Sequence, residues 1–133
     1  MINASEFRLG NYMLQKVAAK ISTVQCSYLH FELMMKEGLL HFFPLQLKPE
    51  LLEKCGFKEN KDYPLLPQAR EFKLALPVSG NGANEIFAYV KNNGECFGRA
   101  VLNAVPISNN FFHLHSLQNL YFALTGKELK TLL

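Results

Sequence analysis

The chain has 133 residues, the length of a single domain that can bury about two-thirds of its unfolded surface. Hydrophobic residues make up 49% of it and charged residues 19%, a balance that is typical of a globular protein and excludes a disordered one. The 14 basic residues only slightly outnumber the 11 acidic residues and are scattered, so no basic stripe predicts a nucleic-acid-binding surface.

The cysteine content and the apolar runs indicate the compartment. The three cysteines are widely spaced without a CxxC pair, which argues against a disulfide framework and a structural zinc site. The amino terminus has no basic region followed by an apolar run, so we expect no secretory signal. The most apolar region, residues 28–47, contains three charged residues, whereas a membrane span needs about 20 apolar residues. We therefore expect a cytoplasmic protein that makes no membrane contact.

The first part of the chain, residues 1–46, is expected to form a β-rich half. Asn3 is suited to cap a helical turn that ends at Phe7, and Gly10 suits a turn that leads into a strand. Residues 13–24 fit both a helix and a strand, and their β-branched content favours the strand.

The next two segments are expected to form a hairpin. Residues 28–35 place apolar side chains at every second position, the period of a half-buried strand. A turn at residues 36–38 then leads to a returning strand, residues 39–43, which Pro44 ends. Both faces of the returning strand carry bulky side chains, which predicts a central place in its sheet.

The middle of the chain, residues 47–58, is expected to contain a short helix. Pro49 suits the first helical position, and Gly56 suits the residue that ends a helix. Phe57 follows that glycine and is placed to contact Leu52, as in a Schellman ending. We expect a surface connection after this helix, up to Gln68.

The last part, residues 70–133, is expected to form antiparallel strands and a terminal helix. Residues 71–76 alternate in polarity, and the Asn-Gly pair at 93–94 predicts a hairpin between strands at 86–91 and 95–105. A final short strand at 111–114 is expected to lead into the helix.

The terminal helix has the clearest pattern of the chain. Four apolar side chains recur at i, i+3, i+4 and i+7 and predict one buried face: Leu117, Leu120, Tyr121 and Leu124. Ser116 suits the N-cap and Gly126 the left-handed closing residue. We expect this face to pack on the β scaffold.

The opposite face of that helix carries a candidate interaction surface, formed by Gln118, Asn119 and Phe122. An aromatic ring is unusual on a simple surface helix, so one interpretation is contact with another chain. The alternative is that Phe122 packs under the carboxyl-terminal tail and that the two amides act as local caps.

The fold class that we predict is α+β. A single domain, residues 1–133, would hold a mostly antiparallel sheet, curved or small and barrel-like, with two short packing helices, one central and one C-terminal. Its parts would be an N-terminal β half at 1–46, the short helix at 47–58, and the strands and terminal helix at 70–133.

Three segments resemble a family of small uncharacterised proteins from Bacteroidetes, their prophages and mobile elements. The family shows an early R-[IL]-G-N-[YW], a central P-L-x-x-E-x-L-x-x-x-G-F and a terminal H-x-L-Q-N-L-Y-F-A-L-T-G-x-E-L. The matching positions here are residues 8–12, then Pro44, Leu45, Glu50, Leu52, Gly56 and Phe57, and finally His115, residues 117–126, Glu128 and Leu129. This chain departs from the family at Lys48-Pro49, where a threonine cap is usual, which concerns the exact helix start. The resemblance implies no activity, cofactor or catalytic residue.

Two histidines are the strongest metal-ligand candidates. His113 and His115 would project from the same face of a strand. A zinc site would need a further ligand such as His30, His41 or Cys96, and no spacing brings one of these close. We therefore assign no metal site and interpret both histidines as structural or solvated side chains.

The sequence evidence for a catalytic cysteine or a phosphate-binding loop is equally weak. A cysteine nucleophile needs a neighbouring base, yet Cys96 lies in a predicted strand and Cys55 on an apolar helix face. The glycine-rich residues 79–82 match no phosphate-binding motif and join two strands. We assign no catalytic and no cofactor-binding residues.

The function that we predict is a non-enzymatic accessory or protein-interaction module of the phage or mobile-element type. It would act by binding another protein or by self-association. The first alternative is a small β-barrel module that binds nucleic acid. The second is a small enzyme, which would need a pocket where His113, His115 or a cysteine converges with other polar groups.

Overall fold

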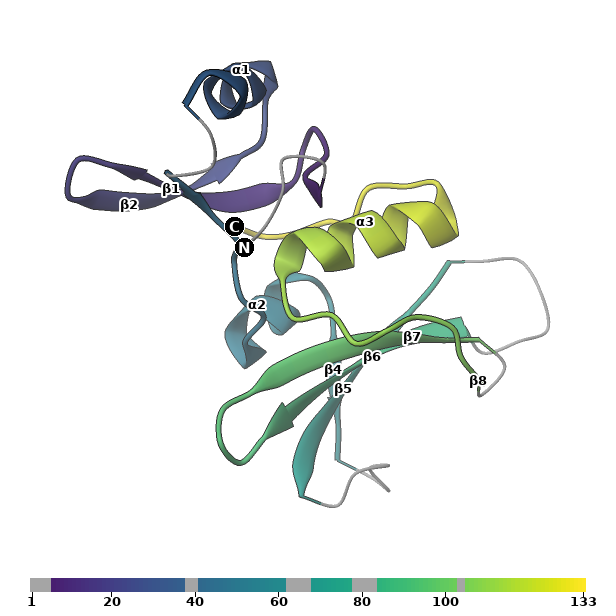
Figure 1. The fold of residues 1–133 in the computed structure, drawn as a ribbon. Helices are drawn as coiled ribbons and strands as arrows, with labels where there is room; N and C mark the ends of the chain where they lie inside the picture. Colours follow the sequence, from purple (N-terminus) through teal and green to yellow (C-terminus); the bar gives the residue numbers. More distant parts are fainter. Residues whose placement is uncertain (1–5, 38–40, 62–67, 78–83, 103–104) are drawn as a thin grey trace.

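The computed structural model describes residues 6–37, 41–61, 68–77, 84–102 and 105–133 (Figure 1). The cap expected at Asn3, the turn expected at Gly38 and the glycine-rich segment at 79–82 involve residues outside these ranges. The described chain is α+β with two open, antiparallel sheets, which confirms the predicted fold class. Within these ranges neither sheet closes into a barrel.

The smaller sheet has three strands in the order β2-β1-β3, with one helix beside it. Its elements are β1 (Tyr12–Val17), β2 (Lys20–Gln25), α1 (Tyr28–Glu37) and β3 (Phe42–Phe43). The larger sheet has the order β4-β5-β6-β7-β8. Its strands are β4 (Lys58–Asn60), β5 (Ala69–Ala75), β6 (Asn84–Lys91), β7 (Cys96–Leu102) and β8 (Val105–Pro106). The remaining helices are α2 (Pro49–Lys54) and α3 (Leu114–Thr125).

The two sheets have separate apolar cores. Helices α2 and α3 pack on one face of the five-stranded sheet, where Leu52, Leu114 and Leu117 are fully buried with Phe72 and Ile86. Helix α1 covers the three-stranded sheet, and Met34 packs there against strand side chains (Figure 1). The longest described helix, α3, has 12 residues and rises roughly 18 Å. No described helix has the length and apolar character to cross a membrane.

The terminal helix confirms the prediction that its leucines bury on a β scaffold. Leu117 is fully buried and Leu120, Tyr121 and Leu124 pack against the same core. Gly126 closes the helix with a φ of 72°, as expected. The expected start was wrong, because the helix begins at Leu114, before Ser116, and has no side-chain cap.

Backbone contacts explain this earlier start. The Leu114 N–H donates to the Leu45 carbonyl at 2.8 Å, so a distant segment satisfies one of the N–H groups of the first turn that have no partner within the helix. The expected final strand is reduced to two isolated bridges, Gly98 with Phe111 and Gln46 with His113.

Residues 28–35 form helix α1, so the predicted strand was wrong. The helix turns Phe31 and Met34, three positions apart, toward the small sheet. Leucine, methionine, glutamate and lysine, which dominate the segment, are strong helix formers. Ser27 begins the helix as in a capping box, since its N–H donates to His30 Nδ1 at 3.0 Å and its carbonyl accepts from Phe31.

The segment before α1 is a hairpin, which confirms the preference for strand in residues 13–24. The turn lies at Ala18, whose φ is 55°, between β1 and β2. The expected central strand at 39–43 was wrong in its described part, since β3 is short and lies at a sheet edge. Phe42 is buried on one face and Phe43 is 41% exposed on the other, so bulk on both faces did not signal a central place.

Helix α2 begins and ends where Pro49 and Gly56 predict. Helix α2 begins at Pro49, and the Phe57 N–H donates to the Leu52 carbonyl at 3.0 Å after Gly56, which confirms the Schellman ending. Lys48 stands where a threonine cap was expected from the resemblance, and it is an N-cap without a side-chain hydrogen bond. Strand β4 replaces the first part of the expected surface connection because it pairs with β5.

Candidate functional site

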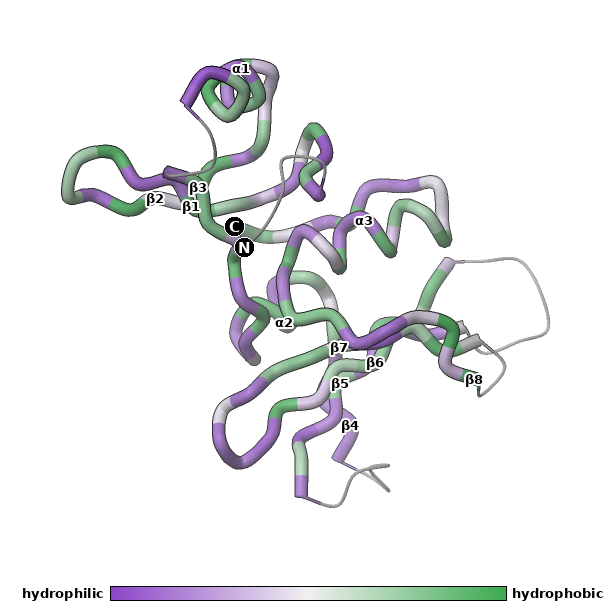
Figure 2. Tube along the Cα trace, viewed as in Figure 1, coloured by the Kyte–Doolittle hydropathy of each residue, from purple (hydrophilic) through white to green (hydrophobic). Residues whose placement is uncertain are grey.

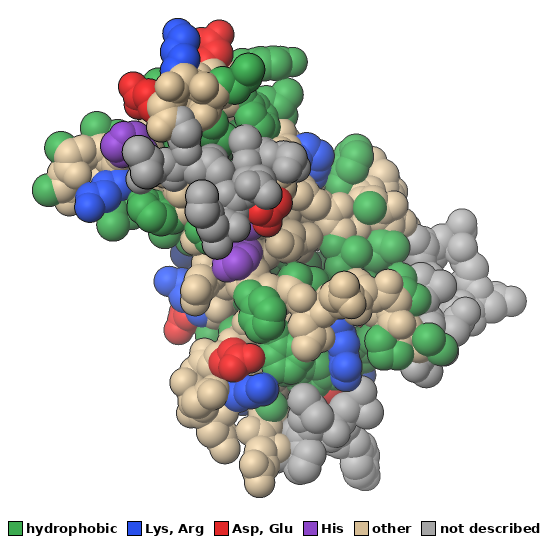
Figure 3. All heavy atoms as spheres, in the orientation of Figure 1, with side chains coloured by type: hydrophobic (Ala, Val, Ile, Leu, Met, Phe, Trp, Pro, Cys, Tyr) green, Lys and Arg blue, Asp and Glu red, His purple; other side chains and the backbone are tan. Residues whose placement is uncertain are grey.

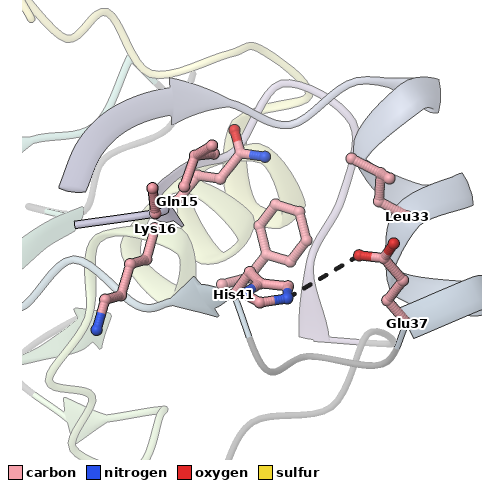
Figure 4. Close-up of a pocket in the computed structure, with 8 residues that line it drawn as sticks. Gln15, Lys16, Leu33, Glu37 and His41 are labelled. Carbon is pink, nitrogen blue, oxygen red and sulfur yellow. Dashed lines mark ion pairs between the residues drawn. The ribbon is translucent and has the colours of Figure 1, made fainter. Parts of the chain in front are cut away.

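A cavity of about 280 Å³ lies between the hairpin tip, the last turn of α1 and the start of β3 (Figure 4). Apolar side chains form its walls, and charged side chains lie at its rim. The lining residues are Gln15, Lys16, Val17, Ala18, Leu33, Glu37, His41 and Phe42. Three chain segments that are separate in the sequence therefore form one concave site.

The unequal lengths of the elements create this cavity. Strand β1 pairs with β2 along all six residues, up to Val17 and Lys20. Its pairing with β3 is limited to Leu14 and Gln15, followed by a 2.8 Å hydrogen bond from the Lys16 N–H to the His41 carbonyl. The end of β1 therefore extends past its neighbour and leaves space beside the helix.

The wall of the cavity is apolar and exposed. Val17 is 62% and Leu33 37% exposed, while Phe42 is almost fully buried and closes the inner side. Figure 2 shows the hydrophobic character of the hairpin tip. Hydrophobic side chains exposed around a concavity are typical of surfaces that bind another molecule.

The rim carries both signs of charge. Glu37 Oε2 lies 4.0 Å from His41 Nε2, and the Lys16 side chain extends away from this pair (Figure 4). Among the described residues Lys16 forms no ion pair. Lys20 is the strand partner of Val17 at the hairpin tip.

The small sheet and its helix expose an unusual amount of apolar surface. Of the 14 large hydrophobic side chains that are exposed in the described chain, this region contributes seven: Val17, Ile21, Tyr28, Leu29, Leu33, Met35 and Phe43. Figure 3 shows such side chains gathered over the hairpin and over α1 on one face of the molecule. The cavity thus lies in a region that holds half of the exposed large hydrophobic side chains of the described chain, and two of them, Val17 and Leu33, line it.

The residues predicted as an interaction surface lie elsewhere. Gln118 is 2% exposed, and its Oε1 accepts a hydrogen bond from the Tyr12 N–H at 2.8 Å. Asn119 Oδ1 accepts from Asn11 Nδ2 at 2.9 Å and from Arg8 Nε at 3.2 Å. Both amides therefore hold the N-terminal segment against α3, which corrects their placement on an outer face and equally their interpretation as local caps.

Phe122 is the most exposed of the three predicted residues. It is 40% exposed and lies 4.4 Å from the Arg8 guanidinium carbon, which stacks over its ring. The same guanidinium forms a bidentate pair with the Glu128 carboxylate. The segment around Arg8 and the terminal helix with the residues that follow it are thus in direct contact.

The two histidines lie at the start of α3, and the expected strand is absent there. Their rings stack with centroids 5.6 Å apart, and His115 is 1% exposed beside Phe7. Burial lowers the pKa of His115 to about 4, helped by His113 and opposed by Glu6. The described residues contain no group of three or more His, Cys, Asp or Glu that fits a metal ion.

Cys96 and His113 line a second cavity, of about 360 Å³. No hydrogen bond joins the thiol to the imidazole within the described residues, and burial raises the pKa of Cys96 to about 11. The thiol is therefore protonated at neutral pH, and no base of the described chain forms a hydrogen bond with it. This arrangement does not support thiol catalysis.

The second face of the five-stranded sheet carries aromatic and basic residues, but the rings are closed off. Phe87, Tyr89 and Phe97 are each less than 10% exposed. Lys73 lies over the first ring at 5.2 Å, Arg99 over the second at 5.5 Å and Lys91 over the third at 5.4 Å. Nucleic-acid-binding sheets stack bases on accessible rings, which this face does not offer.

Sequence patterns missed the cavity because the helical nature of α1 was missed. Ser27 and His30 give the one local signal, a cap followed three residues later by a side chain that bonds back. Comparison with known protein families, with curated proteins and with solved structures finds no match to this chain. The function is therefore inferred from the geometry of the site.

Proposed function

We propose that this protein is a non-enzymatic interaction module that binds a segment of another protein at the cavity beside α1. The segment inserts one large apolar side chain between Val17, Leu33 and Phe42 and places a carboxylate near Lys16. The observation that supports this proposal is a cavity lined by the exposed apolar side chains Val17 and Leu33, in a region that holds half of the exposed large hydrophobic side chains of the described chain.

The size of the cavity favours a single inserted side chain. At about 280 Å³ it is slightly smaller than the roughly 300–1,000 Å³ typical of small-molecule sites. Protein interfaces commonly centre on one aromatic or aliphatic residue that fills such a pocket. Full burial of a leucine or valine side chain stabilises a complex by about 1.5–3 kcal/mol, and Leu33 and Val17 are both partly exposed before binding.

The charges around the cavity favour an acidic partner. Lys16 is without an ion pair among the described residues, whereas Glu37 already lies beside His41. A carboxylate next to the apolar anchor would meet Lys16 at a solvent-exposed rim. Such a contact contributes about 0.2–1 kcal/mol and mainly accelerates association and selects the partner.

A peptide selection tests this proposal directly. A phage-displayed random peptide library is selected on the wild-type protein and depleted on the Leu33→Glu variant, which places a charge in the cavity. We expect enriched peptides with one large apolar residue and an Asp or Glu within a few positions. Their affinity, measured by fluorescence anisotropy, should fall at least about tenfold in Leu33→Glu because the loss exceeds about 1.4 kcal/mol.

Met35→Glu provides the matched control. Met35 lies on the same helix and is 86% exposed, but it does not line the cavity. This variant should bind the selected peptides as the wild type does, and Lys16→Glu should bind them about threefold more weakly. Peptides that bind the two glutamate variants of α1 equally, or a selection without enrichment, would contradict the proposal.

A further inference from the structure

Strand β2 is an open edge of the three-stranded sheet. Among the strands of the described chain it pairs with β1 alone, on one side, and five of its six residues are exposed. An edge strand offers a row of backbone N–H and C=O groups to another strand, and proteins usually block it with prolines, bulges or charges. Here the register from Tyr12 and Gln25 to Val17 and Lys20 is continuous, without a bulge, and Lys20 is the single charged residue of the strand.

The hydrogen-bond phase of the hairpin shows which groups point outward. The Cys26 N–H donates to the Asn11 carbonyl at 2.6 Å, so this pair is a hydrogen-bonded one. Because such pairs alternate in an antiparallel ladder, the groups of Val24 and Ser22 also point toward β1. The backbone groups of Ile21, Thr23 and Gln25 therefore point away from β1, toward the open edge.

We propose that a second copy of this chain pairs with this edge, β2 against β2, through a two-fold axis normal to the sheet at Thr23. This pairing brings the outward groups of Ile21 and Gln25 together across the axis. It joins the small sheets of both copies into one antiparallel sheet of six strands. The proposal is independent of the peptide-binding cavity.

The side chains of β2 fit this symmetric register. Thr23 of one copy lies opposite Thr23 of the second copy, a favourable cross-strand pair. Leu14 is the neighbour of Thr23 within the sheet, and Phe43 is the neighbour of Leu14, so one continuous row crosses the dimer. Phe43 is 41% exposed, which leaves this row accessible in the single chain.

The charges of β2 are compatible with a second copy at this edge. Each copy brings one charged β2 residue, Lys20, three positions from the axis. The two lysines are then six positions apart along the paired strands, or roughly 20 Å. This distance exceeds the screening length of about 8 Å at physiological salt, so the repulsion is small.

The assembly also closes on itself. The opposite edge of the described sheet is β3, which has only two residues and offers little to a further strand. A two-fold dimer uses up β2 in both copies, so no open filament follows. The pairing of two six-residue strands forms a smaller interface than that of a stable obligate dimer. We therefore expect the dimer to dissociate with a Kd on the order of tens of micromolar.

A charge-exchange experiment at the axis tests the register. Sedimentation equilibrium from about 5 to 500 μM should show a monomer–dimer equilibrium for the wild type. Thr23→Lys and Thr23→Glu each place like charges opposite one another and should weaken dimerisation at least tenfold. An equimolar mixture of the two variants should restore the dimer, because only a two-fold at this position pairs residue 23 with itself.

Thr23→Pro and Thr23→Val complete the test. The proline removes an N–H that faces the second copy and none that faces β1, so the chain should fold and remain monomeric. The valine keeps the N–H and the shape and should dimerise as the wild type does. A wild type that is monomeric at 500 μM, or mixed charge variants that stay monomeric, would overturn the proposal. Each variant should still bind the selected peptides, which separates this result from that of the proposed function.

Discussion

Replacement of Gln118 by leucine should destabilise the protein although the two side chains are similar in size. Gln118 is 2% exposed, so its amide is removed from water and serves the N-terminal segment. Its Oε1 accepts from the Tyr12 N–H at 2.8 Å, and its Nε2 donates to the Gly10 carbonyl at 3.4 Å. Leucine fills the same space but leaves the Tyr12 N–H without a partner at this position.

The expected loss of stability comes from the Tyr12 N–H, which would have no acceptor in the variant. A buried donor without an acceptor costs about 1–3 kcal/mol, and the longer bond to Gly10 adds little, so we expect Gln118→Leu to lower the free energy of unfolding by about 2 kcal/mol. Urea denaturation followed by circular dichroism measures this change. Ala123→Gln, at an exposed position of the same helix, should stay within about 0.5 kcal/mol of the wild type. A Gln118→Leu variant as stable as the wild type would refute the role of this amide.

Two further predictions concern buried positions. Because burial holds the pKa of His115 at about 4, below its ordinary 6.5, the unfolded chain binds a proton first and stability should fall by about 3 kcal/mol as the pH drops from 6.5 to 4. Denaturation curves of a His115→Phe variant over this range should lack that part of the slope, and an unchanged slope would contradict the assignment. Gly98→Ala should cost about 1–3 kcal/mol in urea denaturation, since the added Cβ would lie 2.6 Å from the Phe111 ring; full stability would show that the ring moves freely.

The helices with local signals are the parts of the fold that sequence predicts best. Leu117, Leu120 and Leu124 repeat with a helical period, and Pro49 and Gly56 mark the two ends of α2. Each of these signals lies within one element, so no distant contact changes its meaning. The two ends of α3 show the limit: Gly126 closes the helix as expected, whereas the start depends on a hydrogen bond to Leu45, which the local sequence does not reveal.

Helix α1 shows why period alone is ambiguous. Residues 28–35 place apolar side chains both at every second position and three positions apart, so both periods fit. The helical propensity of Leu33 and Met34 and the cap at Ser27 decide for the helix. A strand at 28–35 would place Leu33 in a sheet, whereas the helix leaves it partly exposed at the cavity.

The candidate site depends on contacts that no local pattern contains. The cavity exists because β3 is shorter than β1 and because α1 ends beside the hairpin tip. Helical periodicity correctly placed Gln118 and Asn119 away from the leucine face of α3. The covering group is the segment around Asn11, more than 100 residues earlier in the chain, and only the tertiary structure shows it.

Side-chain methyl NMR during titration with a selected peptide tests the central claim most directly. The claim is that the cavity beside α1 binds a partner segment through its apolar wall. We expect the largest shift changes at Val17 and Leu33, small changes at Leu117 in the core of the other sheet, and loss of the effect in Leu33→Glu. Shift changes confined to the five-stranded sheet, with Val17 and Leu33 unaffected, would contradict the claim.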